Sequence, residues 1–205
     1  MICVPLKNQK TLLKDIQEAE KIADLTEICF DSFSEDFDID QVFKKAKKPI
    51  LYKCIDHQNM EKVLAFKPHY IDLDIATESK VISKVIKLSP KTKIILSHHD
   101  FKKTPSTPEL KSLITKMFRR KAHIAKIAAT AKSFEDSLRI LELLAQISPK
   151  KKVILIAMSK HGQITRSTGH LFGNYLMYAP LSEENKTASG QITAKELNKI
   201  ICLSK

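Results

Sequence analysis

Residues 134–158 read FEDSLRILELLAQISPKKKVILIAM, a helical pattern followed by a short apolar run. The apolar residues of the first part recur at the spacing of one helix face: Phe134, Leu138, Leu141, Leu144 and Ile147. Ser133, followed by two acidic residues, is a suitable N-cap for this helix. Residues 153–158 are apolar throughout, as expected of a strand buried on both faces of a parallel sheet. The stretch therefore predicts a helix followed by a buried parallel strand.

The same alternation extends along the whole chain. Short β-branched, apolar runs occur at residues 2–5, 25–30, 50–54, 70–74, 93–97, 123–128, 153–158 and 175–179. Segments with helical periodicity separate them, among them residues 12–22, 110–117 and 194–201. Alternation without a change of composition indicates one parallel α/β domain over residues 1–205. Eight units predict a single, minimal (β/α)8 barrel. An open doubly wound sheet is the alternative, although no glycine-rich phosphate loop follows any run.

Composition narrows the class of protein. Apolar residues make up 43% of the chain and charged residues 28%, which is typical of a globular protein. The longest clean apolar run, residues 153–158, is far shorter than the roughly 20 residues that span a bilayer. The first residues lack a secretory signal pattern. We therefore expect a cytoplasmic protein without a membrane partner.

The formal net charge of +12 raises the possibility of nucleic-acid binding. Only four of the 35 basic residues are arginine, the residue that base and phosphate recognition favours. Lysine clusters precede several predicted strands, at residues 44–48 and 150–152 for example. In a barrel these positions lie on the face opposite the active site. The charge therefore predicts a solvated lysine surface, or a docking face for an acidic partner, and no nucleic-acid partner.

The carboxyl ends of the strands are where a parallel barrel carries its active site. Lys126 lies within an otherwise apolar run, and burial there would lower its pKa and leave a nucleophilic amine. The alternative is a lysine whose ammonium reaches solvent at the strand end. His98 and His99 end the preceding run and supply a candidate general acid and base. Adjacent strand residues point to opposite faces, so only one of the two histidines can face the site.

All four glycines lie between residues 162 and 190, around Arg166. The cluster indicates either ordinary turns or a loop whose backbone approaches a ligand. Arg166 is isolated in a lysine-rich chain, and a carboxylate that accepts two hydrogen bonds would explain an arginine there. The cysteines are scattered, with no CxxC pair, so we expect no metal site.

The motifs around these residues resemble the type I 3-dehydroquinate dehydratases of the shikimate pathway, over nearly the whole chain. The resemblance rests on Ile2-Cys3-Val4-Pro5-Leu6, Ser97-His98-His99-Asp100-Phe101, Ala125-Lys126-Ile127-Ala128, Leu171-Phe172-Gly173 and Gly190-Gln191-Ile192-Thr193. It implies a cofactor-independent hydro-lyase of aromatic amino acid biosynthesis. Lys126 would form an imine with 3-dehydroquinate, and His99 would act as general acid and base to give 3-dehydroshikimate.

The resemblance also implies a set of substrate contacts. Arg166 and Gln191 would hold the substrate carboxylate, and Glu27 would meet the ring hydroxyls. Thr187 occupies a position where the family usually has serine. Met158 and Tyr178 would form apolar walls. A homodimer, and a fusion to shikimate dehydrogenase beyond the C-terminus, are further expectations.

Two departures from the family pattern keep other functions open. Cys29 and Ile55 stand where the family usually has arginines. Lys53 would replace one of them only if the strand register shifted. The alternatives are a degenerate barrel with weak or no turnover that serves as a binding or structural module, and a Schiff-base enzyme for a related keto acid.

Overall fold

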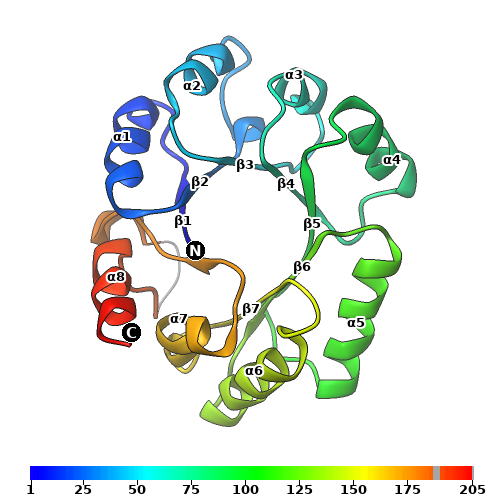
Figure 1. Cartoon of the computed structure of the whole chain (residues 1–205), viewed down its shortest axis with the longest axis vertical. Helices are drawn as coiled ribbons and strands as arrows, with labels where there is room; N and C mark the ends of the chain where they lie inside the picture. The colour runs from blue at the N-terminus through cyan, green and yellow to red at the C-terminus, as the bar shows by residue number, and fades with distance from the viewer. Residues whose placement is uncertain (187–189, 205) are drawn as a thin grey trace.

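The computed structural model describes residues 1–186 and 190–204, in which parallel strands form a ring (Figure 1). The strands are β1 (Ile2–Leu6), β2 (Leu25–Ile28), β3 (Ile50–Lys53), β4 (Tyr70–Asp74), β5 (Lys93–Asp100), β6 (Ile124–Thr130), β7 (Val153–Met158) and β8 (Met177–Tyr178). They form one eight-stranded sheet in the order β7-β6-β5-β4-β3-β2-β1-β8. The prediction of a (β/α)8 barrel is confirmed.

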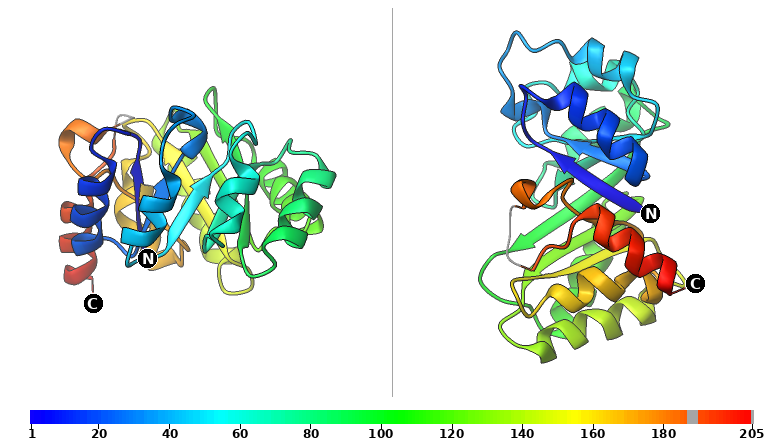
Figure 2. Two further views of the ribbon diagram at one scale, coloured as in Figure 1. Left: turned by 90° about the horizontal axis from the view of Figure 1, so that it is seen from above. Right: turned by 90° about the vertical axis from the view of Figure 1, so that its left-hand side faces the viewer.

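Helices surround the strands on the outside of the ring (Figure 1). They are α1 (Leu12–Ile22), α2 (Ile39–Lys45), α3 (Met60–Ala65), α4 (Ser79–Leu88), α5 (Thr107–Arg119), α6 (Phe134–Ile147), α7 (Gln163–Thr168) and α8 (Ala194–Leu203). Short 3-10 turns follow β2 (η1, Phe30–Ser32), α7 (η2, Gly169–Phe172) and β8 (η3, Glu183–Asn185). Within the described residues, no helix is long and apolar enough to cross a membrane. Figure 2 shows both termini at the same end of the barrel.

The ring is nearly closed, and a side chain bridges the gap between β7 and β8. Asn174 Oδ1 accepts a hydrogen bond from Leu155 N at 2.9 Å, and Asn174 Nδ2 donates to Leu155 O at 3.3 Å. One backbone bond, from Tyr175 N to Val153 O at 2.9 Å, completes the contact. Asn174 therefore satisfies backbone groups of β7 that a full strand pair would satisfy.

The alternation of side chains along each strand separates two apolar cores. One core lies between the strands and the helices, and the other fills the barrel interior. The interior core includes Leu51, Tyr70, Ile95 and Ile124. Two residues further along the same four strands are Lys53, Asp72, Ser97 and Lys126. The inward side of the strands thus changes from apolar to polar toward the carboxyl ends.

Two predictions about element limits and faces are wrong. The second run was expected to stay extended to residue 30, but β2 ends at Ile28 and Phe30 begins η1. Phe30 packs against Phe43 and Tyr52 outside the barrel. On α6, Leu141 and Leu144 of the predicted face are buried, but Phe134 is 63% exposed and Leu138 56% exposed. The buried face is therefore shifted around the helix and also includes Ile140 and Leu143.

Candidate active site

A cavity of about 290 Å³ opens at the carboxyl ends of the strands, where the sequence placed the site. Its walls include these predicted residues: Glu27, His99, Lys126, Met158, Arg166, Tyr178 and Gln191. Thr187 lies outside the described residues. His98, adjacent to His99 on β5, is not among the described residues that line the cavity. The fold therefore brings together residues from β2, β5, β6, β7, β8, α7 and the segment that leads into α8.

Lys126, on β6, is the centre of a buried polar network. Its Nζ donates to Asp72 Oδ2 at 2.8 Å and to Tyr178 OH at 3.0 Å, and lies 3.4 Å from Glu27 Oε2. Tyr178 OH donates to Glu27 Oε2 at 2.9 Å. Lys126 is 5% exposed, so these contacts replace water around the ammonium.

The charge state of Lys126 differs from the prediction. Burial lowers the pKa of Lys126, but the negative charges of Asp72 and Glu27 outweigh burial and raise the pKa above its ordinary value. For Asp72 the effects have the opposite sign. Burial raises the pKa of its carboxyl group, but the positive charges of Lys126 and Lys53 outweigh burial and hold that pKa well below its usual range. The folded chain therefore holds Lys126 as an ammonium, and the prediction of a lowered pKa is wrong. The sequence did not show that Asp72 would face Lys126.

Lys53 is a second lysine on the same carboxylate. Its Nζ donates to Asp72 Oδ1 at 3.0 Å and to Ser97 Oγ at 3.1 Å. Lys53 on β3 pairs in register with Asp72 on β4, so both side chains point into the barrel. Lys53 reaches the site without any shift of strand register.

His99 lies near the end of β5 and lines the cavity with Lys126. Burial, and then the positive charges of Lys126 and Lys53, lower the pKa of His99 to about 4. Its ring is nearly parallel to that of Phe101, with centroids 6.1 Å apart. At neutral pH the imidazole is therefore uncharged and able to accept a proton.

Arg166 is a buried cation on α7, 7% exposed. Within the described part of the chain, its Nε has no hydrogen-bond partner and its guanidinium forms no ion pair. Burial lowers the pKa of Arg166 to about 10, so it stays charged at neutral pH. The neighbouring Thr165 fixes α7 to β7, because its Oγ1 accepts from Ala157 N at 3.0 Å and donates to Gly162 O at 2.8 Å.

Two glycines allow the loops around Arg166 and Gln191 to pack closely. A Cβ on Gly162 would lie 2.2 Å from Ala157 O, and a Cβ on Gly190 would lie 2.4 Å from Ser159 O. Gly190 also has a φ of +77°, in the left-handed region that favours glycine. Each glycine therefore lets one loop contact another, which places Arg166 and Gln191 at the cavity.

Sequence reasoning missed several contacts of this site. Asp72 and Lys53 lie at strand ends, but nothing in the pattern showed that they share a network with Lys126. Tyr178 was expected to be an apolar wall, whereas its hydroxyl bonds to Glu27 and Lys126. Lys7, in the loop that follows β1, also lines the cavity. Cys29 is half-buried and Ile55 is 64% exposed, and neither is among the described residues of the cavity wall.

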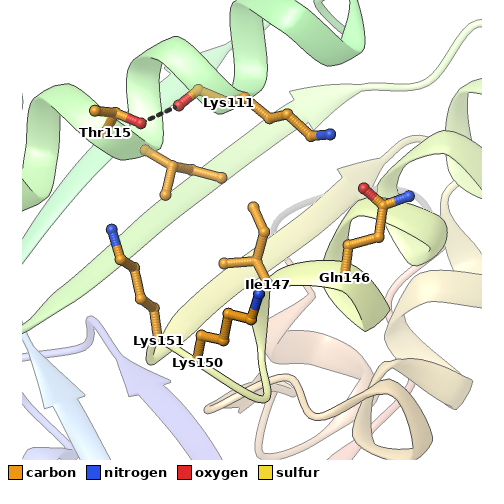
Figure 3. Close-up of a pocket in the computed structure, with 7 residues that line it drawn as sticks. Lys111, Thr115, Gln146, Ile147, Lys150 and Lys151 are labelled. Carbon is orange, nitrogen blue, oxygen red and sulfur yellow. Dashed lines mark hydrogen bonds between the residues drawn. The ribbon is translucent and has the colours of Figure 1, made fainter.

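A second cavity, of about 330 Å³, lies between α5 and the end of α6 (Figure 3). Lys111, Lys150 and Lys151 line it with Thr115 and Gln146. Figure 3 shows the three lysine side chains extending in different directions. This second cavity lies outside the barrel and shares no lining residue with the first cavity. Among the described residues, no cluster of three or more His, Cys, Asp or Glu could hold a metal ion.

Fold and site together define a (β/α)8-barrel protein with a lysine-centred polar cavity at the carboxyl ends of its strands. The family model of type I 3-dehydroquinase matches residues 1–205. The chain belongs to that family, and the prediction of this enzyme family from the sequence motifs is confirmed.

Curated relatives and solved structures agree with the family. The chain is 32% identical to a 3-dehydroquinate dehydratase of Methanococcus maripaludis, over 98% of each chain. It is 35% identical to one of Dehalococcoides mccartyi, over 69% of this chain but only 63% of that protein. A crystal structure of type I 3-dehydroquinate dehydratase from Clostridium difficile, with covalent modified comenic acid, has a TM-score of 0.83 at 26% identity, covering 99% of this chain and 91% of that one.

One solved neighbour carries two named activities in a single chain. It is the dehydroquinate dehydratase and shikimate dehydrogenase of S. pombe, with a TM-score of 0.75 at 17% identity. The match covers 99% of this chain and 44% of that one. At this identity the likeness is one of fold.

Proposed function

We propose that the chain dehydrates 3-dehydroquinate to 3-dehydroshikimate through an imine on Lys126, with His99 as general acid and base. The single observation that carries the proposal is the buried Arg166, whose Nε has no hydrogen-bond partner among the described residues, in the same cavity as Lys126 and His99. A buried cation without a counter-charge is costly, and an anionic ligand removes that cost. A small keto acid supplies both the carboxylate for Arg166 and the ketone for Lys126.

The proposed chemistry begins when Lys126 loses a proton and its amine attacks the C3 ketone. Loss of water gives an iminium, which withdraws electrons from C2. Neutral His99 accepts the C2 proton, and the same proton then leaves with the C1 hydroxyl as water. Hydrolysis of the imine releases 3-dehydroshikimate and restores Lys126. Covalent modification in the Clostridium difficile structure supports covalent capture of a ligand by this family.

The remaining predicted residues have substrate-binding roles in this proposal. Arg166 and Gln191 bind the carboxylate, and Glu27 with Tyr178 meets the ring hydroxyls. Met158 provides an apolar wall at the end of β7. Cys29 and Ile55 leave the hydroxyl side without the two family arginines, and Lys7 is a cation on the cavity wall that can compensate.

Borohydride trapping tests the nucleophile. Reduction in the presence of 3-dehydroquinate should add the ligand mass to Lys126 alone, as read by peptide mass spectrometry. Lys126→Arg should abolish the label, and Lys53→Arg is the matched control that should retain it. A label on Lys53 or on another lysine would sink the assignment.

Turnover is tested by the rise of the conjugated product after addition of 3-dehydroquinate. His99→Ala should keep the trapped imine but slow turnover by about 10²–10⁴-fold, the usual contribution of a general acid–base. If the wild type forms the trapped imine but shows no turnover, the degenerate barrel is favoured instead. The observation that motivates this alternative is that Cys29 and Ile55 stand where the family usually has arginines. One functional domain over residues 1–205, a cytoplasmic location, a homodimer and a fusion to shikimate dehydrogenase stay predictions.

A further inference from the structure

Lys53 and Lys126 bind opposite oxygens of one carboxylate. Lys53 Nζ lies 3.0 Å from Asp72 Oδ1, and Lys126 Nζ lies 2.8 Å from Asp72 Oδ2. The Asp72 side chain is completely buried, so no water shares its charge. Lys53 is not among the described residues that line the cavity, and it joins the Lys126 network through Asp72.

Titratable groups from six strands surround Lys126: Cys3 on β1, Glu27 on β2, Lys53 on β3, Asp72 on β4, His99 on β5 and Tyr178 on β8. The inward residues of β7 that join the interior core, Ile154 and Ile156, are apolar. Burial raises the pKa of both the Cys3 thiol and the Tyr178 hydroxyl well above their ordinary values, so both are neutral.

On the strands, the charges that remain are those of two carboxylates and two ammonium groups, and Arg166 and Lys7 are further cations on the cavity wall. With Lys53 present the cluster is balanced, because Glu27 and Asp72 face Lys126 and Lys53. Without Lys53, Lys126 alone would face two negative charges. That surplus would hold Lys126 more firmly as an ammonium, the form that cannot attack a ketone.

We propose that Lys53 is a positioning residue for Lys126. Lys53 occupies one oxygen of Asp72 and supplies the second positive charge that makes the free amine of Lys126 accessible. The inference rests on the proposed function of Lys126 as the imine-forming residue. Asp72 stabilises the ammonium form of Lys126, and the charge of Lys53 offsets part of that stabilisation. Asp72 still holds the Lys126 side chain toward the cavity.

Acetylation of the free enzyme measures the amine of Lys126 without substrate. Brief exposure to acetic anhydride at fixed pH, followed by peptide mass spectrometry, gives the rate at Lys126. Lys53→Met should slow acetylation of Lys126 on the order of tenfold, the change that follows from a rise of one unit in its pKa. Lys53→Arg, which keeps the charge, should retain the wild-type rate.

Lys53→Gln is a second variant, which removes the charge but keeps a hydrogen-bond donor for Asp72 and Ser97. It should slow acetylation as Lys53→Met does, even if the latter folds poorly. The NMR titration of His99 provides a second readout, because Lys53 is one of the charges that lower the pKa of His99. That pKa should rise in both neutral variants and stay unchanged in Lys53→Arg.

Acetylation of Lys126 at the wild-type rate in a folded Lys53→Met or Lys53→Gln protein would overturn the inference. So would equal slowing by Lys53→Arg, which would indicate that packing rather than charge matters. A higher KM with unchanged acetylation would assign Lys53 to substrate binding instead. Failure of borohydride to trap 3-dehydroquinate on wild-type Lys126 would refute the proposed function, and the acetylation result would remain a separate outcome.

Discussion

At the scale of single residues, Arg166 is a cation that the folded chain leaves unpaired among its described residues. Hydrogen bonds to charged groups contribute about 1.5–3 kcal/mol. Arg166→Gln should therefore raise KM for 3-dehydroquinate by about 10- to 100-fold. The same change removes a buried charge, so urea unfolding of the free protein should show no loss of stability. Steady-state kinetics and unfolding together check both parts.

Arg139→Gln is the control for loss of an arginine from the surface. Arg139 is on α6 and pairs with Asp136 at 2.7 Å, away from the cavity. The Arg139→Gln variant should leave KM for 3-dehydroquinate unchanged. A normal KM in Arg166→Gln would contradict a role for Arg166 in carboxylate binding.

His99 links the stability of the fold to pH. Its pKa is about 4 in the folded chain, below the value of about 6.5 in an unfolded one. Between these values the unfolded chain binds more protons, so stability rises with pH from about 4 to about 6.5. His99→Asn should make the free energy of unfolding depend less on pH in this window, as measured by urea denaturation at several pH values. His98→Asn is the matched control, and an unchanged pH dependence in His99→Asn would refute the burial of a neutral imidazole.

Residue types at strand ends were predictable, but their partners were not. The apolar neighbours of Lys126 made it a candidate, but they left open whether its ammonium faces the barrel interior or reaches solvent at the strand end. Its charge state depends on Asp72, which lies 54 residues away in sequence. The contact between Lys126 and Asp72 forms only if Asp72 points inward from β4 and β4 lies two strands from β6. A one-residue change in the register of β4 would turn Asp72 outward and remove the contact.

At the scale of elements, Asn174 takes the place of a strand partner for β7. Asn174→Leu keeps the approximate size but leaves the buried N–H and C=O of Leu155 unpaired. Each such group costs about 1–3 kcal/mol, so we expect a loss of about 2–5 kcal/mol in the free energy of unfolding. Urea unfolding at equilibrium measures the change.

Asn8→Leu provides the comparison at an exposed asparagine, whose side chain accepts a single bond from Lys10 N. A surface change of this kind should stay within about 0.5 kcal/mol of the wild type. An Asn174→Leu protein as stable as Asn8→Leu would contradict the bridging role of Asn174.

Element limits were predictable for two strands that stand out from the polar residues around them. The limits of β4 and β7 agree with the predicted residues 70–74 and 153–158. The end of β2 was not predictable, because Phe30 is as apolar as a strand residue but packs on Phe43 outside the barrel. The shortness of β8 also escaped the pattern, since a side chain of Asn174 performs part of its pairing.

At the scale of the whole molecule, part of the basic charge lies opposite the active site. Lys44 and Lys45 end α2, and Lys47 follows in the loop that leads into β3. Reversal of all three to glutamate should leave kcat/KM and its dependence on ionic strength unchanged, because the Debye length is only about 8 Å near physiological salt. Kinetics over a range of salt concentrations check the expectation.

Lys7→Glu is the comparison on the active-site face, since Lys7 lines the cavity. It should lower kcat/KM and change the salt dependence, because it places a negative charge where a carboxylate substrate arrives. A large loss in the triple variant would show that these lysines act on the substrate from the far face, against their position in the barrel.

The gap between β7 and β8 divides the barrel into parts that resist local opening to different degrees. Lys126, Asp72 and Glu27 lie on strands within an unbroken ladder, whereas α7 and β8, which carry Arg166 and Tyr178, flank the gap. Transient openings should begin at this gap, because few backbone bonds cross it. Amide hydrogen exchange should then be faster at Tyr175 than at Ala125, and a bound carboxylate should slow it. The proposed nucleophile Lys126 thus lies in the most persistent part of the fold, whereas Arg166, the proposed carboxylate ligand, lies in the part expected to open first.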